Sequence, residues 1–224
     1  MDSVELARQV AAELHARLVA SGADLWSPYD FAVAEARRRG IDVEPTAAGA
    51  AVLNGGRATF VAADDLILHE NIGSRFEQAF LVAHEIGHVE LGDDPSGEAA
   101  PIDPARAAES SPVGMDRVVD YGRRQRREVQ MDLFARELLL PRTVARALHV
   151  DQGLAASVIA AKLGAPFEVV AQQLFDALLL PPVPPAATAA HVERPLNPLQ
   201  AAAAAHRGEA ICLRRGLAPA KHRR

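Results

Sequence analysis

The clearest periodic pattern in the chain is an apolar stripe between Ser74 and Gly92. The stripe has the spacing of one face of a helix and consists of Phe76, Phe80, Ala83, Gly87 and Leu91. Ser74 and Glu77 stand three apart at its start, as in a capping box, where each side chain satisfies the other residue's backbone N–H. Gly92 is a typical residue at a helix end. The pattern therefore predicts an amphipathic helix over residues 75–91.

Three short apolar runs precede this helix and predict a small antiparallel meander. The runs cover residues 50–53, 59–62 and 66–69, and turn-forming residues at 54–56 and 63–65 separate them. Short strands followed by an amphipathic helix predict a small α+β domain in which the sheet supports the helix. An exposed edge strand of such a sheet can also hold an extended peptide.

Helices are also predicted at the N-terminus. Residues 3–20 have an amphipathic pattern, and a second helix is expected to start with Ser27 as N-cap and Pro28 in the first helical position, and to end at Gly40. We expect both helices to cover the sheet.

The predicted helix 75–91 contains His84, Glu85 and His88 in an H-E-x-x-H arrangement. A helix turns about 100° per residue, so side chains four apart project from one face, one above the other. Two imidazoles in these positions can hold one Zn²⁺, and Glu85 beside them can take a proton from water. Two histidines on a helix can also be ordinary surface residues, so the motif predicts a metal site only together with further ligands and a suitable fold.

A catalytic zinc usually takes three ligands from the protein, and the sequence offers two candidates for the third. Asp94 lies where the extended H-E-x-x-H-x-x-G-x-x-H/D motif places a ligand, but that motif needs glycine where this chain has Leu91. Glu128 is the better candidate. It lies on a second predicted helix, and Asp132, four residues later, can orient a ligating histidine through its other ring nitrogen.

The second predicted helix has an apolar face suited to packing against the first, formed by Met131, Phe134, Ala135, Leu138 and Leu139. A different interpretation is that Glu128 and Asp132 only form ion pairs with nearby arginines. The arginines in question are Arg124, Arg127 and Arg136.

The two helices together resemble a known family. H-E-I-G-H-V-E-L at residues 84–91 and E-V-Q-M-D-L-F-A-R-E-L-L-L-P at residues 128–141 are similar to the ImmA/IrrE family of intracellular zinc metallopeptidases. The hallmark of that family is an H-E-x-G-H helix followed by an E-x-x-A-[ND]-x-F-A-x-x-L-L-x-P helix. The resemblance covers about residues 45–180. The chain departs from it at Met131, where a small residue is usual, and this is a packing change that leaves the chemistry intact.

The resemblance implies an α+β, zincin-like fold with His84, His88 and Glu128 as zinc ligands and Glu85 as the catalytic acid and base. It also implies a regulatory role, since members of the family cleave helix-turn-helix repressors and release genes for the DNA-damage response or for mobile-element transfer. The expected partner is therefore a protein substrate, a transcriptional repressor.

The residue that stabilises the oxyanion is not identified by a motif. Tyr121, Arg123 and His69 are candidates by residue type. We expect Tyr121 to be a packing residue near the start of the second helix, and His69 to be a surface residue at the end of a strand. The connection from Gly92 to Met115 is longer than loops usually run without a functional reason.

The pattern divides the chain into a zincin-like domain over 1–142, a helical unit over 143–180, a proline-rich linker over 181–195 and a disordered tail over 196–224. The helical unit consists of two predicted helices around the turn Gly164-Ala165-Pro166, as in a helix-turn-helix. Its second helix has no Lys or Arg with which to contact phosphates. We therefore expect packing or substrate recognition rather than binding of nucleic acid.

The tail contains L-N-P-L-Q at residues 196–200, which resembles the opening L-N-x-x-Q motif of UvrD-type DNA helicases. A helicase would next show a phosphate loop, and this chain has none. A DNA sequence that encodes residues 216–222 can encode Gly-Pro-Gly-Thr-Gly-Lys-Thr when read one base back. We therefore expect the front end of a peptidase–helicase fusion, interrupted by a frameshift, with coincidence in an alanine-rich tail as the alternative.

Composition narrows the function classes. A net charge of −5 argues against a protein that binds nucleic acid through bulk charge. The single cysteine, Cys212, excludes an internal disulfide and fits a reducing cytosol. We see no signal peptide and no apolar run long enough to span a membrane. The sequence thus predicts a cytoplasmic zinc metalloendopeptidase. The alternatives are a non-catalytic zinc module of a peptidase–helicase fusion and a helix-turn-helix DNA-binding regulator.

Overall fold

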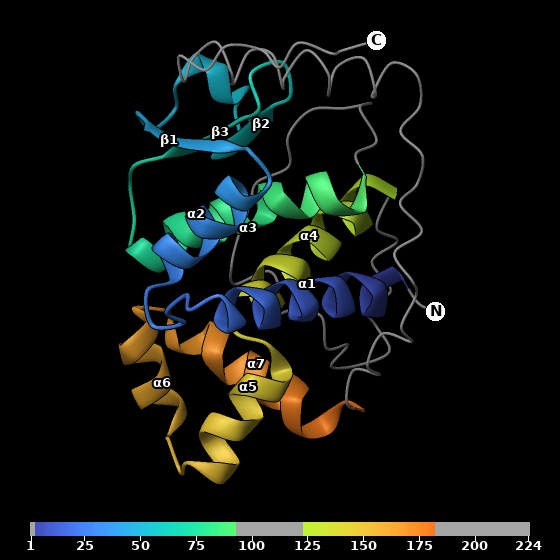
Figure 1. Ribbon diagram of the computed structural model, residues 1–224, viewed down its shortest axis with the longest axis vertical. Coiled ribbons are helices and arrows are strands. Elements are labelled where there is room, and N and C mark those ends of the chain that lie inside the picture. Colours follow the sequence, from blue (N-terminus) through green and yellow to red (C-terminus); the bar gives the residue numbers. More distant parts are fainter. Residues whose placement is uncertain (1–2, 93–122, 182–224) are drawn as a thin grey trace, which may run out of the picture. The chain divides into compact units, whose positions relative to one another are not determined.

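A small three-stranded sheet and a series of helices make up the part of the chain that the computed structural model describes, residues 3–92 and 123–181 (Figure 1). The elements from the N-terminus to the first gap are α1 (Ser3–Ala20), α2 (Pro28–Arg38), β1 (Asp42–Thr46), the 3-10 helix η1 (Ala51–Leu53), β2 (Ala58–Val61), β3 (Leu66–Glu70) and α3 (Arg75–Leu91). The elements after it are α4 (Arg123–Leu139), α5 (Arg142–Arg146), the π-helical turn η3 (Ala147–Asp151), α6 (Ala156–Leu163) and α7 (Phe167–Leu179). The α+β class predicted from the sequence is confirmed.

The sheet has the strand order β1-β3-β2 and mixes both kinds of pairing. β2 and β3 form an antiparallel hairpin in which Phe60 lies opposite Ile67, as the two later apolar runs predict. The prediction for residues 50–53 is wrong, because this run forms η1 and ends at Asn54 in the left-handed conformation. The third strand is β1, which pairs parallel to β3, so the sheet is not the expected antiparallel meander.

β1 lies at an edge of the sheet, and the register shows which of its backbone groups face outward. The Asp42 N–H donates to the carbonyl of Asp65, and the Thr46 carbonyl accepts from the N–H of Asn71. Because the residues of a strand alternate in direction, the backbone groups of Pro45 face away from β3. Pro45 is tolerated there, since its missing N–H removes no bond from the ladder.

Helix α3 lies against the sheet, and its start matches the predicted capping box. The Glu77 N–H donates to Ser74 Oγ at 3.2 Å, and the Ser74 N–H donates to Glu77 Oε2 at 2.7 Å. The helix ends at Gly92, whose φ of 78° is a conformation that favours glycine. α3 packs against β2 and β3 on one side and against α2 and α4 on others, so it is the central helix of the fold.

Helix α4 packs directly on α3, and a glycine in α3 permits their close approach. A Cβ atom on Gly87 would lie 3.0 Å from Met131 Sδ and 3.0 Å from Phe134 Cδ1. All the residues of the predicted apolar face of α4 are buried. Met131 thus fills space beside Gly87, which agrees with the interpretation of this departure as a packing change.

The predicted N-terminal helices are confirmed in extent, but one of them lies elsewhere than expected. α1 spans the predicted residues and packs mainly against α4, not on the sheet. α2 has Ser27 as N-cap and Pro28 in its first turn, and it contacts β1 and α3. The apolar face of α1 is therefore used in a helix–helix interface, to which Ala7, Ala11 and Leu14 contribute side chains with no exposed surface.

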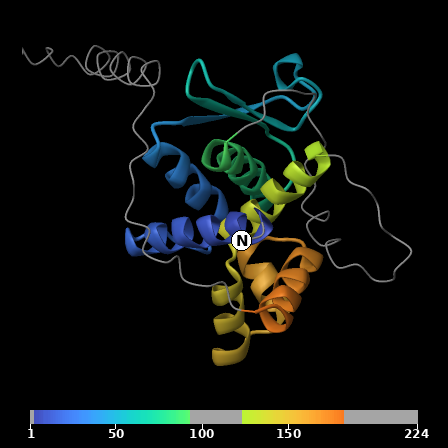
Figure 2. The ribbon, with the colours of Figure 1, turned by 90° about the vertical axis from the view of Figure 1, so that its right-hand side faces the viewer.

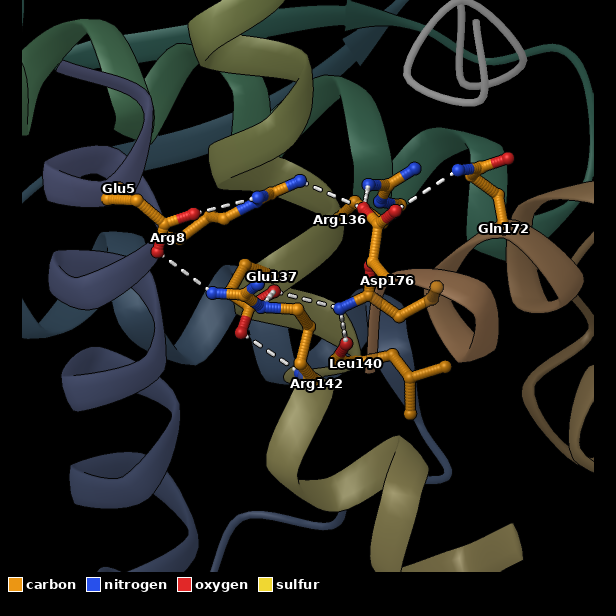
Figure 3. A network of polar contacts seen from close by, with 9 residues as sticks. Glu5, Arg8, Arg136, Glu137, Leu140, Arg142, Gln172 and Asp176 are labelled. Atoms are coloured by element: carbon orange, nitrogen blue, oxygen red, sulfur yellow. Dashed lines mark hydrogen bonds and ion pairs between the residues drawn. The ribbon is translucent and has the colours of Figure 1, made fainter. Parts of the chain in front are cut away.

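A largely buried polar network joins helices α5 and α7 to α1 and α4 (Figure 3). Asp176 of α7 accepts from Arg8 of α1 at 2.8 Å and also from Arg136 of α4. Gln173 donates to the Glu137 carboxylate at 2.8 Å and to the Leu140 carbonyl at 2.6 Å. The polar face of α7 therefore points into the protein.

Buried apolar side chains form one cluster that extends from the sheet through α3 and α4 to α7. Figure 2 shows the same succession of sheet, α3, α4 and α7 from a second direction. The described residues group into one compact unit. The domain boundaries that the sequence predicts stay predictions, and the helicase-like motif lies outside the described residues.

Candidate metal centre

Three metal-binding side chains converge between α3 and α4. His84 and His88 lie one turn apart on α3, and Glu128 lies near the start of α4. One donor atom from each lies within 4.8 Å of the other two. His84 has only 1% of its surface exposed, whereas the side chains of His88 and Glu128 are each 14% exposed. The cluster is therefore closed on the His84 side and reaches solvent on the other.

The distances within the cluster suit one small cation. His84 Nε2 lies 3.1 Å from His88 Nε2 and 3.3 Å from Glu128 Oε2, and the remaining separation, from His88 Nε2 to Glu128 Oε2, is 3.9 Å. Tetrahedral zinc with bonds of about 2.0–2.1 Å places its ligand atoms about 3.3 Å apart. Two imidazoles and one carboxylate are also a donor set of catalytic zinc sites, which leave a fourth position for water or substrate.

Asp132 fixes the orientation of His84. His84 Nδ1 donates to Asp132 Oδ1 at 2.8 Å, and both side chains are 1% exposed. This hydrogen bond leaves Nε2 of the imidazole to face the cluster. Asp132 lies one turn after Glu128 on α4, so a single helix supplies both a donor for the cation and the partner of a second donor. The role proposed for Asp132 from the sequence thus has the geometry that it requires.

The charges around His84 favour a cation at this position. Burial lowers the pKa of His84, but hydrogen bonds with Asp132 and Glu128, together with the charges of Asp132 and Glu85, outweigh burial and raise the pKa to about 10. A buried imidazole surrounded by carboxylates strongly favours positive charge. A divalent cation at Nε2 satisfies the same preference and displaces the proton.

Glu85 lies beside this cluster but is not one of the three converging donors. It follows His84 on α3, is 7% exposed, and its charge acts on His84. A carboxylate near a metal position but outside the ligand set can exchange protons with water or substrate. The sequence assigns this role to Glu85, and its position on α3 is compatible with it.

The other candidate residues from the sequence either lie outside the described residues or have a structural role. Asp94 and Tyr121 lie outside the described residues, as does the side chain of Arg123. His69 is wrongly predicted as a surface residue, since it has no exposed surface. Its Nδ1 donates to the Glu70 carbonyl at 2.8 Å, and its Nε2 accepts from the Tyr29 hydroxyl at 2.9 Å, so it forms a buried link between β3 and α2.

Two of the arginines that the ion-pair interpretation invoked have other contacts. Arg136 contacts Asp176, as Figure 3 shows, and Arg127 donates to the Leu91 carbonyl at 2.7 Å. No motif in the sequence connects Arg127 with the metal centre. A usable signal is that a basic side chain next to Glu128 can reach the C-terminal end of the facing helix, where carbonyls lack intrahelical partners.

The arrangement places three donors that could hold a cation beside the carboxylate of Glu85, and metal-assisted hydrolysis needs groups of these kinds. No described helix is both long enough and apolar enough to cross a membrane. In a comparison with protein families, the model of the peptidase M78 family, described as the IrrE N-terminal-like domain, matches residues 36–175. Neither curated proteins nor solved structures give a match. Because the family match covers more than half of the chain and includes the cluster, the chain belongs to the M78 family of metallopeptidases, that of the IrrE N-terminal-like domain.

Proposed function

We propose that the protein is a zinc-dependent endopeptidase in which His84, His88 and Glu128 hold Zn²⁺ and Glu85 transfers protons. The observation behind this proposal is the convergence of the three donor atoms while the far nitrogen of His84 is held by Asp132. A structural zinc site normally fills all four positions with Cys or His and has no use for a neighbouring carboxylate base. The donor set therefore favours catalysis over the alternative of a non-catalytic zinc module.

When bound, zinc polarises the scissile carbonyl and makes water acidic enough to lose a proton near neutral pH. Glu85 accepts that proton as the water oxygen attacks the carbonyl carbon. The same carboxyl group then delivers the proton to the departing amine nitrogen as the C–N bond breaks. Asp132 keeps the imidazole of His84 in the tautomer that presents Nε2 to the cation.

The substrate that we propose is a protein in the cytosol, specifically a helix-turn-helix transcriptional repressor whose cleavage switches on stress, DNA-damage or mobile-element genes. The support is the resemblance of the two motif helices to the ImmA/IrrE peptidases, together with the family match. Cleavage of a peptide bond inside a folded regulator is an endopeptidase reaction.

DNA binding by helices α6 and α7 is not part of this proposal. α7 directs Gln173 and Asp176 into the interface with α4 and α1. Its exposed side chains include Phe167, Phe175 and Leu179, and it contains no Lys or Arg. Contacts with phosphate supply most of the non-specific affinity for DNA, and this helix has no basic side chain to make them.

The decisive experiment is the metal content of purified protein, measured for the wild type, Glu85→Gln and Glu128→Ala. We expect one zinc per chain in the wild type and in Glu85→Gln, and much less in Glu128→Ala, because only the last substitution removes a donor. Arg146→Gln, an exposed change on α5, is the control and should retain the metal. Zinc retained in Glu128→Ala would refute the ligand set, and no zinc in the reconstituted wild type would refute the proposed function.

Activity is tested with the helix-turn-helix repressor encoded nearest the gene. Wild-type protein loaded with zinc should cut the repressor into two fragments, and Glu85→Gln should hold zinc without cutting it. Fragment masses give the cleaved bond. Cleavage by Glu85→Gln at the wild-type rate would remove Glu85 from the mechanism.

A further inference from the structure

The end of α3 that carries His88 is held to α4 by one arginine. Arg127 Nη2 donates to the Leu91 carbonyl at 2.7 Å and also to the Gly92 carbonyl. Its Nη1 lies 3.4 Å from Gln130 Oε1, within its own helix. The guanidinium group is therefore placed at the C-terminal end of α3, between two carbonyl oxygens and an amide oxygen.

This position is favourable for physical reasons that do not depend on a metal. The last carbonyls of a helix have no partners within the helix and carry its partial negative charge. Gly92 ends α3 with φ of 78° and ψ of 135°. Arg127 supplies N–H donors and a positive charge at that end, and the planar guanidinium can span two acceptors, which a single ammonium group cannot match.

The contact lies next to two of the three metal donors. Arg127 precedes Glu128, and Leu91 lies three residues after His88. The contact of Arg127 with the end of α3, called the clasp below, therefore lies within one helical turn of His88 and of Glu128. Glu128 Oε2 lies 3.9 Å from His88 Nε2. A shift of the α3 end away from α4 would increase that distance first, because His84 is held separately by Asp132.

We propose that Arg127 is a positioning residue of the metal centre, which holds His88 opposite Glu128 so that both reach one cation. This inference rests on the proposed zinc site and adds a residue outside its set of three donors. Ligands held in place before the ion arrives lose less conformational freedom on binding, so the clasp tightens metal binding.

A second arginine holds the same end of α3 and provides the matched control. Arg39, the residue after α2, donates to the Glu90 carboxylate at 2.7 Å and to the Glu35 carbonyl at 3.2 Å. It tethers α3 to α2, on a side of the helix that carries no metal donor. Loss of Arg39 should thus lower stability without changing the approach of His88 to Glu128.

The experiment measures the zinc dissociation constant by chelator competition, the thermal unfolding midpoint of the metal-free protein and kcat for repressor cleavage. The variants are Arg127→Gln, Arg127→Lys and Arg39→Gln. We expect Arg127→Gln to weaken zinc binding about tenfold, the scale for residues that orient metal ligands. Arg127→Lys should recover part of this loss, and Arg39→Gln should bind zinc as the wild type does even where its unfolding midpoint falls.

The outcomes separate the inference from the function on which it rests. Wild-type zinc affinity in folded Arg127→Gln, or an equal loss of affinity in Arg39→Gln, would overturn the role of Arg127 and leave the zinc site standing. If Arg127→Gln does not fold, Arg127→Lys decides by the same comparison with Arg39→Gln. A wild type that binds no zinc would overturn both proposals.

Discussion

At the crossing of α3 and α4, Met131 packs into the space that a side chain on Gly87 would need. A Cβ atom on Gly87 would lie 3.0 Å from Met131 Sδ, closer than side chains normally pack, and Phe134 lies equally near. Gly87 lies between the two histidines of the candidate metal centre. The missing side chain therefore sets how closely the helix with the histidines approaches the helix with Glu128.

Gly87→Ala should lower the free energy of unfolding by about 1 kcal/mol. Overpacking a core costs roughly 1–3 kcal/mol, and alanine regains about 1 kcal/mol of helix propensity over glycine. Urea denaturation of the metal-free protein measures the change. In the Met131→Ala background the cost of the added methyl group should be smaller, because one of its two neighbours is gone. An increase in stability on Gly87→Ala alone would contradict the tight crossing.

Replacement of Asp132 should affect metal binding according to whether a hydrogen-bond acceptor remains. Asp132→Ala removes the group that holds His84 Nδ1, and zinc binding should weaken by about tenfold or more. Asp132→Asn keeps a carbonyl oxygen of similar shape and should lose much less. Chelator competition measures both constants, and equal losses in the two variants would show that the charge of Asp132, not its orienting bond, is what matters.

Asp176 should be essential for stability because two arginines depend on it. Asp176→Asn leaves the buried guanidinium groups of Arg8 and Arg136 without their shared carboxylate, and breaking a buried ion pair costs about 3–5 kcal/mol. Chemical denaturation tests this. Asp151→Asn, an exposed change in the same helical region, should alter stability by less than about 0.5 kcal/mol. A loss below about 1 kcal/mol for Asp176→Asn would mean that water enters the network.

His15 should make the protein less stable in mild acid. Its Nδ1 donates to the Leu138 carbonyl at 2.8 Å, whereas Nε2 is buried and has no hydrogen-bond partner among the described residues. Burial lowers the pKa of His15 below 6.5. A lowered pKa in the folded state means that the unfolded chain binds the proton first. The stabilising contribution is then complete above pH 6.5 and is lost as the pH falls from 6.5 toward the folded-state pKa.

The measurement is the free energy of unfolding as a function of pH, for the wild type and for His15→Gln. The variant keeps an N–H donor for the Leu138 carbonyl but cannot take up a proton. Its stability should fall less steeply between about pH 7 and 5 than that of the wild type. The slope that remains belongs to other groups, among them His69, whose pKa burial also lowers. Parallel curves for the two proteins would contradict the assignment.

The helices were predictable from the sequence because their signals are local. The capping box of α3, Pro28 at the start of α2 and the apolar periodicity of α1 each specify a boundary or a face without reference to distant residues. The pairing of His84 with Glu128 was predictable for a different reason, since motifs on two helices resemble one family. In both cases a few residues are enough to predict the feature, whether a helix boundary or the pairing of two side chains.

The sheet was harder to predict because its signals depend on partners. β1 has the sequence D-V-E-P-T, with Val43 as its one aliphatic residue and a proline, so its strand character comes from pairing with β3. The run 50–53 is apolar but too short to distinguish a strand from a helical turn. The burial of His69 follows from Tyr29, 40 residues away, a contact that no local pattern shows. Arg127 was missed at the metal centre because two of its acceptors are backbone carbonyls at the end of α3, and the sequence around Arg127 does not show which helix end faces it.

Pro45 has one further consequence, which concerns what can join the sheet. An unpaired strand edge is a template for another chain, both for a bound peptide and for unwanted self-association. At the outer side of β1 the template is broken, since proline offers a carbonyl but no N–H where an added strand would need both. The opposite edge, β2, contains no proline. Addition of a strand is therefore disfavoured at β1. At β2 every residue has a backbone N–H, so an extended chain that docks by backbone pairing is expected on the β2 side.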